Sequence, residues 1–460
     1  MTTRRVRARN RATASASVGV LVLTTLSLTG PSVAAAEPPS SWGATVALSG
    51  TPVRSSPDVA VGPSGGINAA WGGDGDVRFR RRPPSSAWLG ERGLGLGGSP
   101  SLGVDGNGNV TAVWFRTRPG LINEIVTARR PLSGSWSAPQ VISRVGEFED
   151  DGTGVRDVDL SVSSGGAVVA AWTWGSDEGG PPQRVQAAYR PAQGGWQGPR
   201  DITTPSQCGG QAATAIGPGG NAVVVCRGND GVIRAVRRLS AGWTSPVAIS
   251  ATNNAHPDIA IGPNGGTVAV WGHHTIASDE PPIEEDDTIK ASRLVSGGSW
   301  TTPQQLSPSG ATAVHPLAVI DGSQTMTVVW RVEVEVGDPD NPTVLSRLDT
   351  ARRPPGTSTA FGARTPIAPL DDRISAVEVA AAPAGDVVVG WFRVGTDASR
   401  LEAVTRPRRH GWTTPVELSG PAGVAGDEAT PAVAVDLCGR GIVAWHDTRV
   451  RIRRMASCAS

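Results

Sequence analysis

The strongest constraint on the fold of this 460-residue chain is a phrase that recurs through almost its whole length. Its fifth version reads HPDIAIGPNGGTVAVW and, after a spacer, IKASRLVSGGSWTTPQQLS. Seven versions end their first half on tryptophan, and the fourth has cysteine there. These positions follow one another at intervals of 43 to 61 residues: Trp71, Trp114, Trp172, Cys226, Trp271, Trp330, Trp391 and Trp445. The chain therefore contains eight versions of one structural unit, which we number as repeats one to eight.

Each repeat divides into four short strands. A run of small residues is followed by a turn rich in Gly, Asn and Pro, where Gly and Asn tolerate the positive φ angles of tight hairpins. A valine-rich run then ends on the central tryptophan, a third run ends on Arg in most repeats, and a second aromatic opens the fourth. These second aromatics are Trp42, Trp88, Trp136, Trp196, Trp243, Trp300, Phe361 and Trp412. An all-β repeat of this length predicts a β-propeller of four-stranded blades.

The two ends of the repeat region complement each other. Residues 42–49 read as a fourth strand with no first three strands before it, and residues 430–455 supply three strands with no fourth. The sequence therefore predicts that the N-terminal strand 42–49 completes the last blade and closes the ring, which removes an open sheet edge. We expect eight blades, or seven if the first repeat is degenerate.

The N-terminus has the pattern of a signal peptide over residues 1–36. A basic segment at Arg4 to Arg9 precedes an apolar core at 18–28, which is too short for a membrane span, and a small-residue cleavage site at 34–36. Export by the general or the twin-arginine route stays open. The expected mature protein is one secreted, extracellular propeller domain over 37–460, and we expect a monomer. Its net charge of +1 gives no reason to expect nucleic acid or a membrane as partner.

Four cysteines in an exported chain favour disulfides. Cys208 precedes the first strand of repeat four and Cys226 ends the second, and antiparallel pairing brings these ends together. Cys438 lies in the turn before the second strand of repeat eight, and Cys458 follows the third. We therefore predict Cys208–Cys226 and Cys438–Cys458. A zinc site is the weaker alternative because no CxxC or Cys-His spacing is present.

The repeats VAVGPSGG…AAW, LGVDGNGNVTAVW and IAIGPNGGTVAVW, with the W-x-x-P-x-x-[LI]-S segments that follow several of them, resemble a broad group of secreted bacterial propellers. This group is similar to the sialidase-like superfamily and is common in actinobacteria. The resemblance spans nearly all of residues 42–456. Sialidases carry S-x-D-x-G-x-x-W turns, which are absent from this sequence, and a tyrosine nucleophile. The only tyrosine here is Tyr189, in a third strand. The resemblance implies the propeller architecture without the sialidase site.

Arginines at the ends of the third strands allow two interpretations. They recur as Arg82, Arg130, Arg190, Arg238, Arg293, Arg353 and Arg406. They form either a ring of anion or sugar sites or structural contacts with the neighbouring aromatics. Repetition in nearly every unit favours the structural interpretation.

Insertions and histidines point to one face of the expected ring. Propeller topology brings the second-to-third and fourth-to-first connections to the same face, and these carry acidic runs at 147–151, 177–178, 279–280, 284–287, 338–340, 371–372 and 427–428. Longer loops usually carry function, and acidic inserts that only solubilise the surface are the alternative. The candidate ligand-binding residues on that face are His256, His273, His315, His446 and Asp447. Histidines beside carboxylates suit a divalent metal or an acid–base pair, whereas scattered surface histidines are commoner.

These features favour a secreted, non-enzymatic propeller that binds a glycan or an extracellular protein through its long-loop face. We predict no catalytic residue, no bound metal and no cofactor. The alternative is a divergent glycoside hydrolase or lyase of sialidase-like architecture, with acidic residues at the axial mouth. Paired carboxylates about 5–9.5 Å apart across that mouth would favour this alternative.

Overall fold

The computed structural model describes residues 41–118, 122–143, 154–175, 183–274, 288–295, 298–310, 312–338, 341–356, 360–395, 399–420, 430–456 and 458. Residue contacts divide the chain into Met1–Glu37 and Pro38–Ser460, and every described residue belongs to the second unit. The predicted signal peptide lies outside the described residues. Within the described part of the chain, no helix is long and apolar enough to cross a lipid bilayer.

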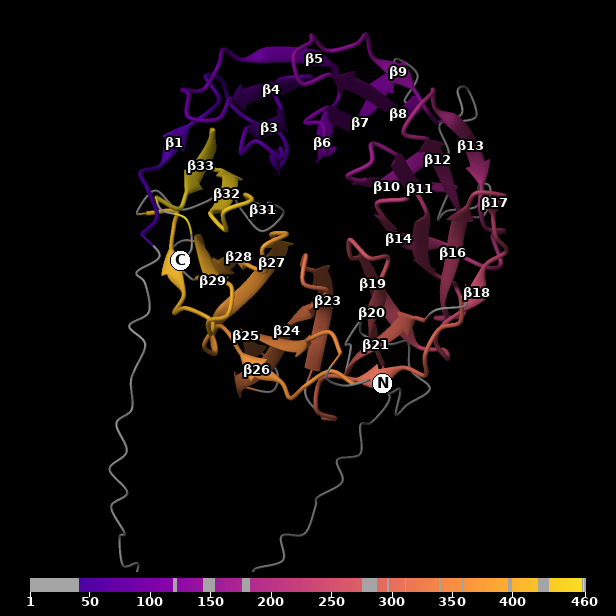
Figure 1. Cartoon of the computed structure of the whole chain (residues 1–460). Coiled ribbons are helices and arrows are strands. Elements are labelled where there is room, and N and C mark those ends of the chain that lie inside the picture. Colours follow the sequence, from indigo (N-terminus) through magenta and orange to yellow (C-terminus); the bar gives the residue numbers. More distant parts are fainter. Residues whose placement is uncertain are drawn as a thin grey trace, which may run out of the picture. The chain divides into compact units, whose positions relative to one another are not determined.

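Antiparallel sheets surround a common axis, as the repeats predict (Figure 1). The innermost strands are β2 (Asp58–Val61), β6 (Gly98–Val104), β10 (Gly154–Val162), β14 (Gly210–Ile216), β19 (Asn254–Ile261), β23 (Thr312–Ile320), β27 (Asp371–Ala381) and β31 (Ala432–Val435). The second strands are β3 (Ile67–Gly72), β7 (Val110–Arg118), β11 (Val168–Gly175), β15 (Ala222–Arg227), β20 (Thr267–His273), β24 (Met326–Asp338), β28 (Val387–Val394) and β32 (Gly441–His446).

The third strands are β4 (Asp76–Arg82), β8 (Ile122–Arg130), β12 (Arg184–Arg190), β16 (Ile233–Leu239), β21 (Thr288–Leu294), β25 (Asn341–Arg353), β29 (Ser399–Arg406) and β33 (Val450–Arg454). The outer strands are β1 (Val46–Ala47), β5 (Arg92–Leu96), β9 (Gln140–Val141), β13 (Gln197–Asp201), β17 (Gly242–Trp243), β18 (Val247–Ala248), β22 (Gln304–Gln305), β26 (Thr365–Pro366) and β30 (Val416–Glu417).

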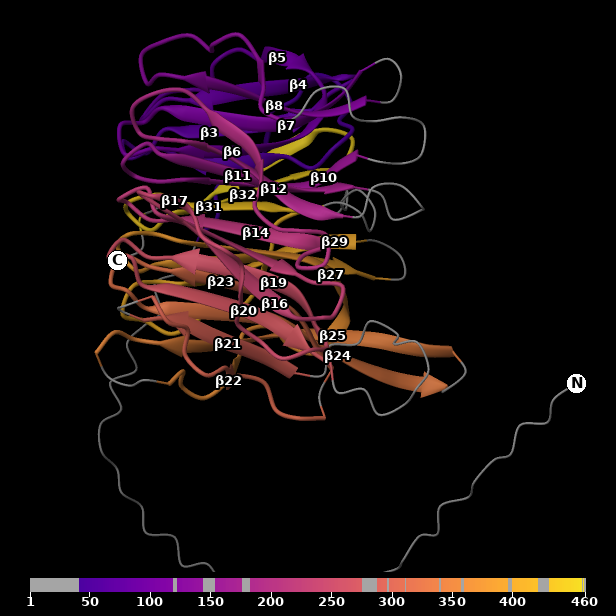
Figure 2. The ribbon, with the colours of Figure 1, turned by 90° about the vertical axis from the view of Figure 1, so that its right-hand side faces the viewer.

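Most repeats form a separate four-stranded sheet, and repeat four adds β18 to its sheet. Repeats six and seven share one eight-stranded sheet because β25 pairs with the start of β27 at Leu345↔Asp372 and Ser346↔Asp371. Figure 2 shows the β24–β25 hairpin extending past its neighbours on one face. That hairpin is a second-to-third connection, so it belongs to the face where the sequence places the long insertions.

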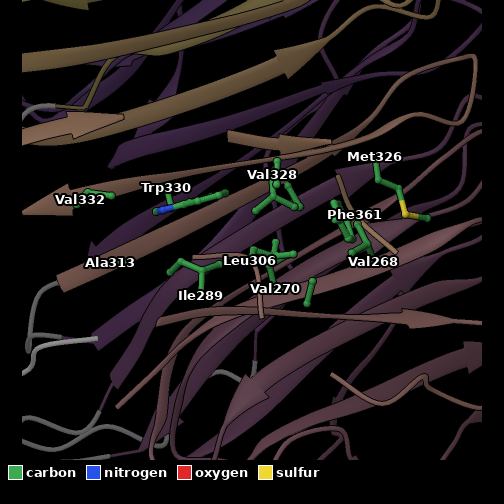
Figure 3. Close-up of a cluster of buried hydrophobic side chains, with 13 residues drawn as sticks. Val268, Val270, Ile289, Leu306, Ala313, Met326, Val328, Trp330, Val332 and Phe361 are labelled. Carbon is green, nitrogen blue, oxygen red and sulfur yellow. The ribbon is translucent and has the colours of Figure 1, made fainter. Parts of the chain in front are cut away.

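The core lies between neighbouring sheets. All seven central tryptophans are fully buried, and the valine-rich second strands are buried on both faces. In one cluster Val268, Val270 and Ile289 of repeat five pack against Val328 and Trp330 of repeat six (Figure 3). Each buried aliphatic side chain contributes about 1.5–3 kcal/mol when removed from water. The repeated sequence pattern therefore describes inter-sheet packing, because each repeat completes the core of the next.

The N-terminal strand pairs with the C-terminal repeat as expected. β1 aligns Val46 with Ile452, and Trp42 forms a bridge with Met455. The Val450 amide donates to the Ser49 hydroxyl at 2.9 Å. Leu48 joins a core cluster with residues of repeats one and eight. Residues 42–49 thus cover the edge of β33, which would otherwise expose unpaired backbone groups.

Both disulfides join the pairs that the sequence predicts. Cys208 is bonded to Cys226 with their Cα atoms 5.9 Å apart, and Cys438 to Cys458 at 5.2 Å. Cys208 and Cys226 are fully buried. Where the other repeats bury a tryptophan, repeat four buries a covalent bond.

Candidate functional site

A cavity of about 930 Å³ opens at one end of the axis. Its wall combines inner-strand residues of repeats one, two, three, seven and eight with His446, which ends β32. Ser56, Ser99, Asp58 and Glu378 are among the residues that line it. Its volume falls within the range of small-ligand sites. The fourth-to-first and second-to-third connections therefore meet at one axial mouth.

The carboxyl groups on the inner strands follow an alternating pattern. One equivalent position carries an acid in the odd-numbered repeats: Asp58, Asp159, Asp258 and Glu378. The even-numbered repeats have Ser101, Ala213, Leu317 and Ala432 there. Sequence reasoning missed these acids as site residues, because the first strands stand out only as runs of small residues. An alignment of the eight first strands is the signal that would have found them.

Each aspartate joins two neighbouring repeats. The Asp58 carboxylate accepts the amide of Leu102 at 2.6 Å, and that of Asp258 accepts the amide of Ala318 at 2.7 Å. Asp159 accepts the amide and the hydroxyl of Thr214, at 2.6 and 3.1 Å. Since carboxylate oxygens have further lone pairs, these bonds leave capacity for ligand hydroxyls. The three aspartates thus have a structural role whether or not a ligand binds.

Glu378 differs from the three aspartates. Glu378 lines the cavity, and within the described part of the chain no hydrogen bond or ion pair engages its carboxyl group. Burial, followed by repulsion from Asp58, Asp258 and Asp159, raises the pKa of Glu378 to about 8. Burial also raises the pKa of Asp258 and, to a smaller degree, that of Asp58. All these side chains keep partial contact with solvent, which moderates the cost of ionising them.

A β-bulge precedes the acidic position in several inner strands. The pairing register shifts there, for example between Ala255 and Asp258 and between Val314 and Leu317. The equivalent residues Ser99, Gln211, His256 and His315 have φ of 48–50°. Non-glycine residues rarely adopt this left-handed conformation, which concentrates at functional sites. Bulges of this kind change the direction of a side chain, and the residue concerned is polar in all four strands.

The candidate histidines have different described neighbours. The ring centroids of His256 and His315 lie 4.0 Å apart. Burial lowers the pKa of His315, and charge repulsion from His256 and Arg331 lowers it further. His273 Nδ1 lies 3.0 Å from the Asn254 side-chain oxygen, at the outer ends of β19 and β20.

His446 lines the axial cavity, and its Nδ1 lies 3.2 Å from the backbone oxygen of Asp447. The Asp447 carboxylate pairs with Arg451 at 2.6 Å. Among the described residues, no group of three or more His, Cys, Asp or Glu side chains could hold a metal ion. The five candidates therefore do not form one metal-binding cluster, and His446 is the member that lines the axial cavity.

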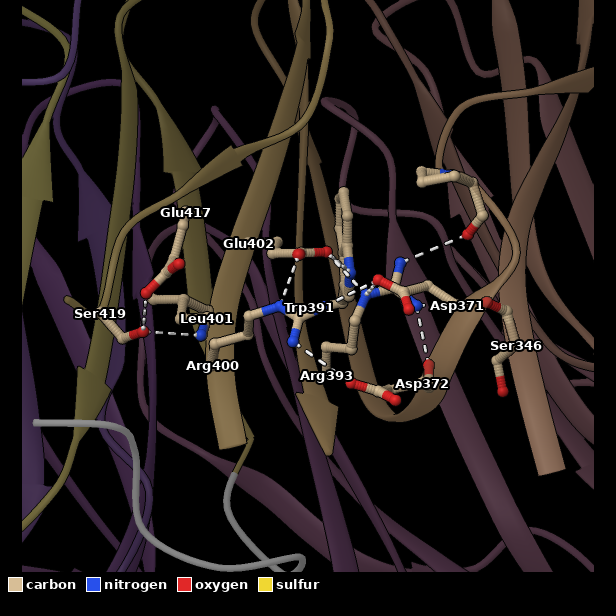
Figure 4. A network of polar contacts seen from close by, with 11 residues as sticks. Ser346, Asp371, Asp372, Trp391, Arg393, Arg400, Leu401, Glu402, Glu417 and Ser419 are labelled. Carbon is tan, nitrogen blue, oxygen red and sulfur yellow. Dashed lines mark hydrogen bonds and ion pairs between the residues drawn. The ribbon is translucent and has the colours of Figure 1, made fainter. Parts of the chain in front are cut away.

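Most of the predicted acidic loops lie outside the described residues: 147–151, 177–178, 279–280, 284–287, 339–340 and 427–428. Asp371 and Asp372 are described and pair with Arg400 at 2.7 and 3.2 Å (Figure 4). In the same network Arg393 and Trp391 both donate to Glu402. This acidic pair is therefore neutralised by arginine rather than free to receive a cation.

Two of the arginines that end third strands, Arg190 and Arg238, make structural contacts. Arg190 is buried and donates to the carbonyl of Gly166 at 3.0 Å. Arg238 lies over the ring of Tyr189 at 4.6 Å, and the Tyr189 hydroxyl donates to the carbonyl of Gly220 at 3.1 Å. Tyr189 is thus on β12, away from the residues that line the axial cavity.

Known structures share this architecture, although no protein-family model and no curated protein matches the sequence. The BP39L lectin from Burkholderia pseudomallei matches with a TM-score of 0.53 and 16% identity, over 80% of this chain and 100% of the lectin. An ulvan lyase, which is a polysaccharide lyase, matches with a TM-score of 0.49 and 12% identity. The match covers 76% of this chain and 90% of the lyase. A fucose-specific lectin from Aleuria aurantia matches with a TM-score of 0.38 and 15% identity. The match covers 69% of this chain and 97% of that lectin. At 16% identity the similarity to the BP39L lectin concerns the fold alone.

Proposed function

We propose that this protein is an exported, eight-bladed β-propeller that binds a glycan in its axial cavity. The observation that carries the proposal is the cavity wall, where serines and acidic residues line a volume suited to a small ligand. Sugar hydroxyls both donate and accept hydrogen bonds, and such a wall offers both functions. A bacterial lectin of similar fold supports the choice of a glycan without specifying the sugar.

The proposed number of eight blades assigns one blade to each repeat. The eight-stranded sheet contains two sets of four strands, β23–β26 and β27–β30, joined by one short pairing. Contacts of β31 with both β27 and β2 support a ring closed through the last repeat. Two disulfides and the predicted signal peptide support export to an oxidising compartment.

The charged residues that line the cavity indicate which class of sugar it would bind. Asp58, Asp159 and Glu378 line it, with Arg54 and His446 as the basic residues among its lining. Arg54 is exposed, and its guanidinium lies 3.6 Å from the Asp74 carboxylate. Carboxylates repel a sugar acid, and a protonated Glu378 can donate a hydrogen bond as well as accept one. We therefore favour a neutral or amino sugar over a uronic, sialic or sulfated one.

A glycan array probed with the purified mature protein tests this function. We expect binding to neutral or amino glycans, and weaker binding by Glu378→Gln, which keeps the shape of the side chain. Glu417→Gln is the matched control, because Glu417 is an exposed glutamate in the same repeat. Binding to no glycan would contradict the proposal, and capture of an extracellular protein would point to the other ligand class.

The histidines remain candidate ligand contacts in this proposal. In the double variant His256→Ser/His315→Ser, both histidines become serine, which Ser99 shows can adopt the same left-handed conformation. We expect this variant to fold and to bind the selected glycan more weakly. Unchanged affinity would exclude both side chains from the site.

The alternative function, hydrolysis or elimination of a glycosidic bond, has one observation in its favour. The pKa of Glu378 is raised next to carboxyl groups with smaller shifts, and divergent pKa values in neighbouring acids are a feature of acid–base catalysis. The backbone bonds of Asp58 and Asp159 favour a structural role for these partners. Release of reducing or unsaturated ends by the parent, but not by Glu378→Gln, would establish the enzymatic function.

A further inference from the structure

Two cavities adjoin on the outer edge of the ring between repeats three and four. Their volumes are about 380 and 580 Å³, and both are lined by Arg200 and Trp243. Arg200 lies on β13 and Trp243 on β17, which are neighbours at the outer edge in Figure 1. We call the two cavities together the outer groove. It is remote in the fold from the axial cavity, since none of the residues lining it belongs to an inner strand.

The outer groove departs from the repeat pattern. Tyr189, the only tyrosine in the chain, lines it where equivalent positions have Arg129, Arg237 or Ser292. The Trp243 side chain is partly buried against core residues of repeats three and four and borders the groove. The groove therefore combines aromatic surface with polar side chains, which is the composition that binds the apolar face of a ligand and orients its polar groups.

Among the charged side chains that line the outer groove, that of Arg200 is available to bind an anionic ligand. Asp201 pairs with Arg184 at 3.1 Å and accepts a hydrogen bond from Gln186 at 2.8 Å. Arg238 lies over Tyr189 and donates to Gln197 at 3.5 Å. The Arg200 residue is exposed, and among the described residues no group forms a hydrogen bond or ion pair with its guanidinium. Three arginines against one aspartate give the groove a positive charge.

We propose that the outer groove is a second carbohydrate site, which takes a sugar bearing a carboxylate or sulfate group. Trp243 supplies an apolar surface for the pyranose ring, and the Arg200 guanidinium pairs with the acidic group. Arginine forms planar, two-pronged hydrogen bonds with such oxyanions. The charge preference is opposite to that of the acidic axial cavity, so the two sites select different parts of a polysaccharide. This inference does not depend on the axial site.

Calorimetric titration of the mature protein tests the inference with three probes: a sulfated tetrasaccharide, a uronic-acid oligosaccharide and a neutral oligosaccharide. We expect at least one anionic probe to bind at low salt, and which one binds distinguishes sulfate from carboxylate. Arg200→Gln should weaken this binding about tenfold or more, because hydrogen bonds to a charged group contribute strongly. Trp243→Phe keeps an aromatic side chain in the core and should cause a smaller loss.

Two control variants separate binding in the outer groove from nonspecific attraction to arginine and from binding in the axial cavity. Arg92→Gln removes an exposed arginine from β5, the corresponding outer strand of repeat one, and should leave affinity unchanged. Glu378→Gln changes the axial cavity and should also leave anionic binding unchanged. The inference is overturned if neither anionic probe binds, if Arg200→Gln binds as the parent does, or if Arg92→Gln weakens binding equally. Loss of anionic binding in Glu378→Gln would move the ligand to the axial cavity and overturn it as well.

Discussion

At the scale of single residues, the inner-strand aspartates connect the repeats through backbone amides. Asp258 accepts the amide of Ala318 in the next repeat, although burial raises the pKa of its own carboxyl group. A neutral acceptor at this position would keep the hydrogen bond without the cost of a desolvated charge. The aspartates are therefore less favourable for stability than a neutral acceptor would be. They place acidic groups around the axis, which is consistent with the proposed ligand binding.

We expect Asp258→Ala to be less stable than Asp258→Asn by about 1–3 kcal/mol, because alanine leaves the Ala318 amide without an acceptor. Urea unfolding of both variants measures this difference. Ser101→Ala is the matched control: it changes the equivalent position of repeat two and should change the free energy of unfolding by less than about 0.5 kcal/mol. Equal stability of the alanine and asparagine variants would show that the bond between repeats contributes nothing.

The raised pKa of Glu378 predicts a pH dependence of stability. An unfolded glutamate ionises near its model value of 4.5, whereas folded Glu378 keeps its proton up to about pH 8. Folding therefore gains from this group below pH 4.5, and the gain is lost as pH rises toward 8. Asp58, Asp159 and Asp258 act in the same direction, while Arg54 and His446 are the basic groups that line the cavity.

Glu378→Gln should therefore lose less stability than the parent between pH 5 and pH 8. The difference should be at least about 1.4 kcal/mol, which corresponds to one pKa unit. Thermal unfolding across this pH range, with Glu417→Gln as the exposed control, provides the measurement. Parallel pH profiles for the parent and Glu378→Gln would mean that this carboxyl group titrates normally.

At the scale of strands and sheets, the sequence predicts regular features well and local irregularities poorly. The four-strand repeats, the buried tryptophans and both disulfide pairs follow from spacing, since antiparallel neighbours have fixed proximity. The bulges at His256 and His315 and the short β25–β27 pairing do not follow from spacing, because they depend on the detailed packing of adjacent strands. The sequence predicts the histidines on one face. The structure brings His256 and His315 together, and it places His273 beside Asn254 near the start of β19.

The alternating acids show a different limit. Their positions are readable from the sequence, but their significance depends on the ring, which brings residues 58, 159, 258 and 378 toward one axis. A single repeat gives no reason to single out Asp258 among the polar residues of its strand. The acidic loops, in contrast, are conspicuous in sequence, and the described pair Asp371 and Asp372 binds Arg400.

The disulfide of repeat four should contribute strongly to the stability of its sheet. A bond that closes a loop of 18 residues contributes about 3 kcal/mol through chain entropy. Cys208→Ala/Cys226→Ala should lose at least this much in denaturant unfolding, because both sulfurs are also buried. The comparison variant Cys438→Ala/Cys458→Ala lacks a bond whose Cys458 end is exposed, and should lose less. Equal losses would assign the whole effect to loop closure.

At the scale of the whole molecule, pairing of β1 with β33 joins the ends of the repeat region. A chain that begins at Gly50 lacks this outer strand and exposes both the β33 edge and the remaining residues of the cluster that contains Leu48. We expect aggregation or a lower melting temperature, measured by light scattering during thermal unfolding. A truncated chain that melts like the complete mature protein would show that the ring does not need this strand.

The proposed function depends on binding of a neutral or amino glycan in the axial cavity. A crystal structure of the mature protein with the glycan selected on the array would decide it. We predict the sugar between the inner strands, with its hydroxyls on Glu378 and Asp159 and on the serines of repeats one and two. A sugar bound elsewhere, with an empty axial cavity, would contradict the proposed function.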